Sequence, residues 1–171
     1  MGPQGLQSAL SRPGLTSRCK TSKVLFVCWA NINRSQIAES IFNGLAEGDR
    51  AISAGISPRR AGVLVRNEHN NPFLPMCERG YDLSKARVKR LDRKAADSAG
   101  KVVLIFGRNH LKDVPDYLLR RPDIELWDVG SISDQTSFKE YCRLERKRIA
   151  TIERRVRGLL RRLEPHRAKI L

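Results

Sequence analysis

The sequence predicts an α/β fold, in which a parallel β-sheet is covered by helices on both faces. Short apolar runs rich in β-forming residues alternate along the chain with segments of helical spacing, and this alternation is typical of parallel sheets. The chain has 171 residues, of which 40% are hydrophobic, which suits one domain with its own core. It contains no run of the roughly 18–20 apolar residues that a membrane-spanning helix needs, so no membrane span is expected.

Four segments have the composition of buried strands. Residues 23–28, Lys-Val-Leu-Phe-Val-Cys, form a short apolar run, as expected of a parallel strand buried on both faces. Residues 51–55 are a second candidate, and residues 101–106 are the clearest strand in the chain. Residues 124–127 offer a fourth.

Helical spacing marks the segments between these strands. The first helix follows a loop after the first strand, and its apolar positions are Ile37, Ala38, Ile41, Phe42 and Leu45. Residues 73–80, 91–97 and 109–119 are also helix-like. Pro72 and Pro75 mark a break or a helix start.

The last segment is predicted to be one long amphipathic helix. Its apolar stripe consists of Phe138, Cys142, Ile149, Ile152, Val156, Leu159 and Leu163. Arginines occupy the other side, and Glu145 interrupts the stripe. Because only about three heptads are present, we expect a single helix that docks on the sheet rather than a coiled coil.

The net charge of +15 is concentrated at the two ends of the chain. Residues 1–23 carry +4 and residues 139–171 carry +8, so the middle carries only +3. We therefore expect a basic leader at residues 1–22, either disordered or a transit peptide, an α/β domain at 23–164 and a basic tail at 165–171. The basic last helix is either a solvated surface or a docking site for an acidic partner or nucleic acid.

The cysteines give no sign of a zinc site or a disulfide framework, because no C-x-x-C pair occurs. They are Cys19, Cys28, Cys77 and Cys142. Unpaired cysteines favour a reducing compartment, so a cytoplasmic location is expected. The three histidines are far apart in the sequence, and we expect neither a metal nor a cofactor.

The sharpest feature is a C-x5-R motif followed by serine, from Cys28 to Arg34 and Ser35. Cys142 and Arg148 match the same spacing, but they lie within the predicted last helix, where five residues cannot curl around a ligand. Cys28 instead ends a strand, and Arg34 opens a helix. In open α/β sheets, ligands bind beyond the carboxyl ends of the strands.

This strand, loop and helix arrangement suits phosphate chemistry. Free N–H groups of the loop and of the first helical turn form an anion cradle, and the helix dipole favours negative charge there. The same field lowers the pKa of a cysteine, so Cys28 is a candidate nucleophile. Arg34 can hold two phosphoryl oxygens in a bidentate grip, and Ser35 can donate its hydroxyl to the sulfur.

The residues around this motif resemble the low-molecular-weight protein tyrosine phosphatases. The resemblance begins at Val24-Leu-Phe-Val-Cys-Trp-Ala-Asn-Ile-Asn-Arg-Ser-Gln-Ile-Ala-Glu39 and continues through Ser53-Ala-Gly55, Glu78-Arg-Gly-Tyr-Asp-Leu-Ser84 and the strand that ends at Phe106. It spans about residues 23–163 in the same order. It implies a three-layer fold with a four-stranded parallel sheet and a phosphate loop after the first strand.

The resemblance also implies a reaction, the hydrolysis of a phosphomonoester through a cysteinyl-phosphate. Cys28 would attack phosphorus, Arg34 would hold the equatorial oxygens, and an aspartate would protonate the leaving oxygen without any metal. The substrate-binding residues would be Trp29, Ala30, Asn31, Ile32, Asn33 and Ser35. The implied ligands are a phosphorylated protein or a small aryl phosphate, and inorganic phosphate bound in the loop.

Two loop positions bear on the choice of substrate. Ile32 stands where tyrosine-directed members also carry Ile, whereas members directed to phosphoarginine carry Thr, and this favours phosphotyrosine. Trp29 either walls the pocket and stacks on an aryl ring or packs under a neighbouring loop.

Three positions depart from the family pattern. Ala30 replaces the loop glycine, which would strain the backbone if that position requires a positive φ. Asn33 replaces the second cysteine of the loop, so the protective disulfide of many relatives cannot form. The Asp-Pro that supplies the general acid is absent. Asp128, which directly follows the fourth predicted strand, is predicted to take its place, and the alternatives are Asp134 or no general acid at all.

These departures keep other functions open. Without a general acid, the protein would be a slow enzyme or a phosphate-recognising pseudoenzyme, or a basic binding module on the same fold. Arsenate reduction uses the same loop, but its thiol relay needs two further cysteines about seven residues apart, and only Cys77 lies in that region.

Overall fold

The computed structural model of the protein describes residues 23–46, 51–133 and 135–163. The expected leader and tail, and with them Cys19 and Asp134, lie outside the described residues. The strands are β1 (Lys23–Cys28), β2 (Ala51–Gly55), β3 (Ala99–Leu104) and β4 (Ile124–Leu126). The α-helices are α1 (Arg34–Ala46), α2 (Phe73–Cys77), α3 (Arg93–Ser98), α4 (Asp116–Leu119) and α5 (Phe138–Leu163). None of the helices in the described chain is long and apolar enough to cross a membrane.

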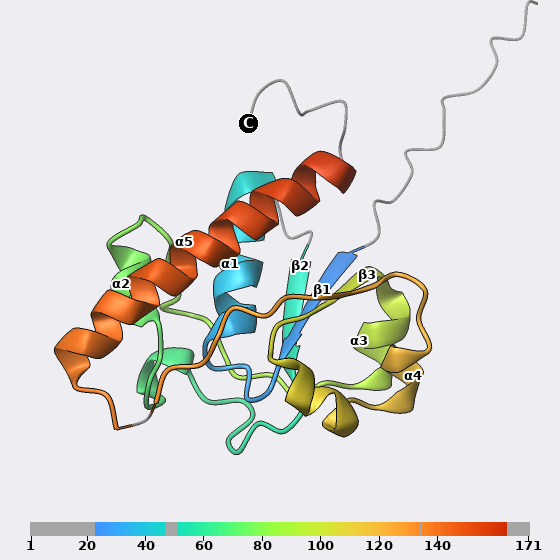
Figure 1. Ribbon diagram of the computed structural model, residues 1–171, viewed down its shortest axis with the longest axis horizontal. Helices are drawn as coiled ribbons and strands as arrows, with labels where there is room; N and C mark the ends of the chain where they lie inside the picture. Colours follow the sequence, from blue (N-terminus) through green and yellow to red (C-terminus); the bar gives the residue numbers. More distant parts are fainter. Residues whose placement is uncertain (1–22, 47–50, 134, 164–171) are drawn as a thin grey trace, which may run out of the picture.

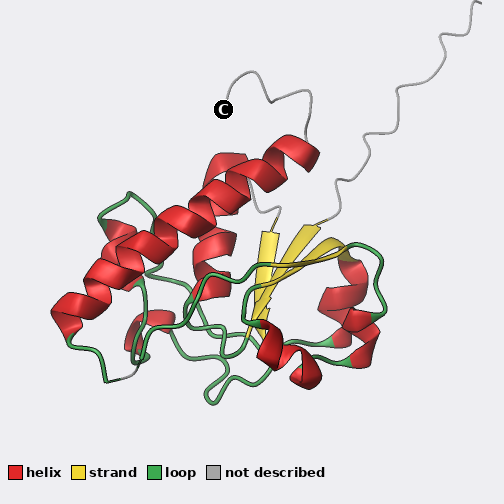
Figure 2. Ribbon diagram, viewed as in Figure 1, coloured by secondary structure: helices red, strands yellow, loops and turns green. Residues whose placement is uncertain are grey.

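The four strands form one parallel sheet with the order β2-β1-β3-β4. Helices α1 and α5 lie on one side of this sheet, and α3 and α4 lie on the other (Figure 1). The predicted α/β fold with helices on both faces is therefore confirmed. Because β1 is an inner strand, its carboxyl end lies beside those of β2 and β3, where loops gather (Figure 2).

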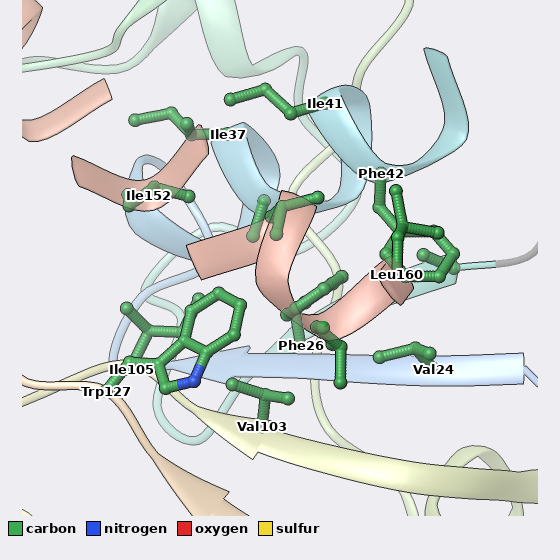
Figure 3. Close-up of a cluster of buried hydrophobic side chains, with 14 of the residues drawn as sticks. Val24, Phe26, Ile37, Ile41, Phe42, Val103, Ile105, Trp127, Ile152 and Leu160 are labelled. Carbon is green, nitrogen blue, oxygen red and sulfur yellow. The ribbon is translucent and has the colours of Figure 1, made fainter. Parts of the chain in front are cut away.

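Alternate residues of β1 face two separate hydrophobic cores, as the period of two in a strand requires. Val24 and Phe26 face the core beneath α1 and α5, and Leu25 and Val27 face the core beneath α3 and α4. Figure 3 shows the first core, where Phe26 lies within an aromatic cluster. Its ring centroid is 5.9 Å from that of Phe42 and 5.7 Å from that of Trp127. Both faces of β1 are thus held, and this fixes the position of Cys28 at its end.

Several predicted boundaries differ from the observed ones. The strand expected at residues 101–106 runs from Ala99 to Leu104, although Ile105 N still donates to Val27 O at 2.7 Å. The helix expected at 109–119 is two short ones, a 3₁₀ helix at Arg108–Asp113 and then α4. Pro115 stands between them and has no N–H with which to continue the first helix.

Three other predicted elements have shifted boundaries, and two of them end earlier than expected. The helix predicted at residues 73–80 ends at Cys77, because Gly80 adopts a φ of 81° and reverses the chain. The strand predicted at 124–127 ends at Leu126, one residue earlier. The helix predicted at 91–97 is observed at Arg93–Ser98.

Helix α5 confirms the predicted long helix, but the two ends of its expected apolar stripe are wrong. Phe138 is 71% exposed and Leu163 is 42% exposed, because both lie beyond the part of α5 that packs on the sheet. The buried stripe runs from Tyr141 to Leu160. Glu145, which interrupts the pattern in the sequence, is fully buried.

The arginine side of α5 is not a free basic stripe. Arg143 pairs with Glu140, Arg146 with Glu78 and Arg157 with Glu153. These three arginines are therefore neutralised by carboxylates of the same chain. This gives no support to a docking site for nucleic acid on this helix.

Candidate active site

A cavity of about 450 Å³ opens at the carboxyl end of β1. The loop between β1 and α1 supplies Cys28, Trp29, Ala30, Ile32, Asn33 and Arg34. Two further loops add Ser57, Arg59, Glu68, His69, Asn70, Ser131 and Ile132, and α5 adds Tyr141 and Arg148. The predicted motif residues thus meet in one pocket with residues from distant parts of the chain.

The loop that carries the motif ends in an open helix N-terminus. The first intrahelical bond of α1 runs from Ile37 N to Asn33 O at 3.0 Å, so the N–H groups of the preceding helical residues have no helical acceptor. No acidic side chain lies in the first turn of α1. The guanidinium of Arg34 has no hydrogen-bond or ion-pair partner among the described residues. This end of the loop is therefore suited to bind an anion.

The sulfur of Cys28 receives two contacts from this loop. Asn31 N donates to Cys28 Sγ at 3.3 Å, and Ser35 Oγ lies 3.0 Å from the same atom. Both contacts place a group that can donate a hydrogen bond beside the sulfur. This is the contact between Ser35 and Cys28 that the sequence predicts.

Asn31 fixes the conformation of the loop. It is fully buried, and its backbone adopts a φ of 54°, in the left-handed region that Asn tolerates better than most residues. Its Oδ1 accepts a hydrogen bond from Lys89 N at 2.7 Å, so the amide nitrogen must face the other way. That nitrogen donates to Ser35 Oγ at 2.9 Å and to Ser53 Oγ at 2.8 Å.

This network orients the proton of Ser35. Because Ser35 Oγ already accepts from Asn31, its own hydrogen is free to point at Cys28 Sγ. Ser53 donates in turn to Glu39 Oε2 at 2.5 Å. The strain anticipated at Ala30 is not found, because the positive φ of this loop falls on Asn31 and not on Ala30.

Gly55, at the end of β2, supports the loop from behind. A Cβ atom at this position would lie 2.8 Å from the carbonyl carbon of Ala30 and 2.8 Å from Asn31 N. Any side chain larger than hydrogen would therefore push the loop backbone away from the sheet. The glycine is required by this close approach, since its φ is not in the left-handed region.

Asn33 ties the loop to α5, at the position where relatives carry a second cysteine. Its Nδ2 donates to Tyr141 Oη at 2.9 Å and to Asn70 O at 3.2 Å, and its Oδ1 lies 3.4 Å from Arg148 Nη1. Tyr141 donates its own hydroxyl to Asn70 O at 2.6 Å. Burial raises the pKa of Tyr141, so this hydroxyl stays protonated.

A buried ion pair between Glu145 and Arg148 lies beside this contact. Glu145 Oε2 and Arg148 Nη1 are 3.1 Å apart, and the two side chains are 0% and 8% exposed. Burial raises the pKa of Glu145, and the positive charge of Arg148 opposes part of that rise. Glu145 Oε1 and Arg148 Nε are buried without a hydrogen-bond partner. Helix α5 thus brings a second guanidinium to the pocket that contains Arg34.

The remaining walls combine aromatic and apolar side chains. Trp29 is half-buried and lines the pocket, with its ring centroid 5.4 Å from that of His110. Ile32, Ile132 and Tyr141 line the pocket as well. Trp29 therefore forms part of the wall and also packs on the 3₁₀ helix that carries His110.

Asp128, predicted as the general acid, lies outside the lining of the pocket. It is exposed, and its Oδ1 accepts from Gly130 N at 3.1 Å. The residues of this loop that do line the pocket are Ser131 and Ile132. Among the described residues, Glu68 supplies the carboxylate of the lining.

Sequence reasoning missed Glu68, Tyr141 and Arg148. Glu68 lies in a loop with no recognisable pattern. A signal for Arg148 does exist in the sequence, because Glu145 interrupts the apolar stripe of α5 and an arginine follows three residues later, at ion-pair spacing. No group of three or more potential metal ligands gathers within the described part of the chain.

Comparison with known proteins identifies the fold. The family model for low molecular weight phosphotyrosine protein phosphatase matches residues 23–169. None of the curated proteins compared with the chain matches it significantly.

Solved structures with this fold have different activities in their names. A thioredoxin-dependent arsenate reductase of Corynebacterium glutamicum has 23% identity and a TM-score of 0.61 over 88% of this chain, which spans only 65% of that protein. A low molecular weight protein tyrosine phosphatase from T. tengcongensis has 23% identity and a TM-score of 0.60, covering 80% of this chain and 99% of its own. An arginine phosphatase from Geobacillus stearothermophilus has 18% identity and a TM-score of 0.64, covering 88% and 97%. At these identities the likeness is one of fold.

Proposed function

Because the chain belongs to the low molecular weight phosphotyrosine protein phosphatase family, we propose that it hydrolyses phosphomonoesters through a cysteinyl-phosphate on Cys28. The observation that carries the proposal is the setting of the Cys28 sulfur. Cys28 ends a buried strand, and its sulfur accepts from Asn31 N and contacts Ser35 Oγ. Cys28 and Arg34 line the same pocket. A nucleophile and an anion clamp thus share one cavity.

The reaction has two steps. The Cys28 thiolate attacks phosphorus, the P–O ester bond breaks, and the leaving oxygen takes a proton from an acid in the pocket. Arg34 and the free N–H groups at the start of α1 stabilise the charge on the equatorial oxygens. Water then attacks the phosphocysteine, the P–S bond breaks, and inorganic phosphate leaves with the thiolate restored.

The walls favour an aryl phosphate as substrate. Trp29, Ile32 and Tyr141 line the cavity, and such side chains form apolar contacts with a ring. We therefore propose a phosphotyrosine residue of a protein, or a small aryl phosphate, as the substrate. The free thiols of Cys28, Cys77 and Cys142 suit a reducing compartment, and we propose the cytoplasm.

The proton donor is the part of the mechanism that the family pattern does not supply. For Asp128 to serve, its carboxylate would have to leave the N–H of Gly130 and enter the pocket. The position of Asp128 favours one alternative function, a pseudoenzyme that binds phosphate without turnover.

Arsenate reduction receives less support from the site. A thiol relay needs further cysteines near the nucleophile, but Cys77 is exposed, Cys142 is buried, and neither lines the pocket.

The test is turnover of an aryl phosphate by the wild-type protein, by Cys28→Ser and by the matched control Cys77→Ser. We expect slow hydrolysis that Cys28→Ser abolishes and Cys77→Ser leaves intact, together with a phosphocysteine at Cys28 after rapid acid quenching. Phosphate binding without turnover in the wild-type protein would indicate the pseudoenzyme. Unchanged turnover in Cys28→Ser would show that the proposed chemistry is wrong.

A further inference from the structure

We propose that Glu68 is the proton donor to the leaving group, in place of the aspartate that the family pattern lacks. This inference rests on the proposed phosphatase function and adds a catalytic residue to it. Glu68 is the carboxylate that lines the pocket of Cys28 and Arg34 in the described part of the chain. A phosphatase of this kind needs an acid there, because a phenolate with a parent pKa of about 10 is a poor leaving group unless it is protonated.

The backbone around Glu68 is held in place. Glu68 N donates to Val65 O at 3.0 Å, and Glu68 O accepts from Asn71 Nδ2 at 2.6 Å. The neighbouring Asn70 O accepts from Asn33 Nδ2 and from the hydroxyl of Tyr141. The segment that carries Glu68 is therefore tied directly to the phosphate loop and to α5.

The side chain of Glu68 is mostly buried but has spare hydrogen-bonding capacity. It is 11% exposed, and its Oε1 forms an ion pair with Arg60 Nε at 3.4 Å but has no hydrogen-bond partner within the described part of the chain. A buried carboxylate oxygen without a hydrogen bond is costly. Binding a substrate whose ester oxygen shares a proton with Glu68 would give this oxygen the hydrogen bond that it lacks. Asp128, in contrast, already accepts from Gly130 N and lies outside the pocket.

Glu68 alone can donate the proton that the first step needs and accept the proton that the second step releases. In the first step the protonated Glu68 gives its proton to the ester oxygen as the P–O bond breaks and the S–P bond forms. Glu68 is then a carboxylate, and it accepts a proton from the water that attacks the phosphocysteine. When the P–S bond breaks, Cys28 is again a thiolate and Glu68 is again protonated.

Leaving-group dependence tests this role. Phenyl phosphate needs protonation of its leaving oxygen, whereas p-nitrophenyl phosphate releases a much more stable anion. We expect Glu68→Gln to reduce kcat/KM for phenyl phosphate by about 10²–10⁴-fold, the usual contribution of a general acid, and to reduce it far less for p-nitrophenyl phosphate. Glu78→Gln is the matched control, because Glu78 is also paired with an arginine, Arg146, but lies outside the pocket. It should lower neither rate.

Four variants and one binding measurement separate the possible outcomes. Equal losses on both substrates in Glu68→Gln, or weaker binding of vanadate, would indicate a structural role and overturn the proposal. A leaving-group-dependent loss in Asp128→Asn or His69→Gln but not in Glu68→Gln would also overturn it, since His69 lines the same pocket. If Cys28→Ser abolishes turnover while Glu68→Gln leaves it unchanged, only the role of Glu68 fails. If the wild-type protein is inactive, or Cys28→Ser remains active, both proposals fail.

Discussion

Replacing Arg148 with methionine leaves the carboxylate of Glu145 buried without its cation. The wild-type pair is separated by 3.1 Å, with side chains that are 8% and 0% exposed. Breaking a buried ion pair by removing one partner costs about 3–5 kcal/mol, because the remaining charge is uncompensated. For a chain of this length, each 1 kcal/mol lowers Tm by roughly 2–4 °C. We therefore expect Arg148→Met to melt roughly 6–20 °C below the wild type.

The cost should depend on pH, and its sign follows from Glu145. Burial raises the pKa of Glu145 above its unfolded value, and Arg148 opposes that rise, so the pKa rises further in the variant. A carboxyl group with a raised folded pKa contributes stability that is complete below its unfolded pKa of about 4.3 and is lost as pH rises through the folded pKa. The difference between variant and wild type should therefore be larger at pH 7.5 than at pH 4.5.

Urea denaturation at both pH values measures this difference in the free energy of unfolding. The double variant Glu145→Leu/Arg148→Met removes both charges, and we expect it to recover to within about 1 kcal/mol of the wild type or to exceed it. Two results would refute the reasoning: an equal loss for Arg148→Met at both pH values, or a double variant as unstable as the sum of the two single variants. Either would mean that packing, and not the uncompensated carboxylate, accounts for the loss.

Three further variants test the loop and the core. Gly55→Ala places a Cβ 2.8 Å from the loop backbone. Because this displaces the loop, we expect kcat/KM of the variant to fall roughly 10²-fold. Unchanged kinetics would show that the loop accommodates the methyl group without disturbing the site. In Asn31→Ala the backbone keeps a φ of 54°, which costs about 1–2 kcal/mol for a residue other than glycine or Asn. The variant also loses buried hydrogen bonds worth about 1–3 kcal/mol, and urea titration would measure the combined loss in the free energy of unfolding. Phe26→Ala should lose about 3–5 kcal/mol by the same titration, and a loss below about 1 kcal/mol would contradict its place in the core.

The fold and the phosphate loop could be predicted because their signals are local. An apolar run, five loop residues and a helix opening at Arg34 are adjacent in the sequence, so Cys28, Arg34 and Ser35 could be placed together before their geometry was known. The strand boundaries were less predictable. Ile105 and Phe106 have strand composition and are fully buried, yet they lie beyond the last residue of β3. The buried part of the segment is longer than the part that pairs with neighbouring strands.

The far wall of the pocket could not be predicted because it depends on tertiary packing. Arg148 is 114 residues from Arg34 in the sequence, and no local pattern brings them together. Phe138 was expected to be buried from helical periodicity alone, but periodicity does not show how far a helix extends past the sheet. Asp128 is a candidate general acid because it follows the strand predicted at residues 124–127, and a position in the sequence does not determine which way a loop side chain points.

The Asn33 contact with α5 has a consequence for the order in which the protein becomes functional. Cys28 and Leu163 are separated by 135 residues, so at about 5–20 residues per second the ribosome makes the nucleophile roughly 7–27 s before the last helix is complete. Until α5 has been made, Asn33 lacks Tyr141, and the core that contains Phe26 has the side chains of α1 but not those of α5. The thiol of Cys28 is therefore among the first parts of the domain to be synthesised, and its pocket is the last to close.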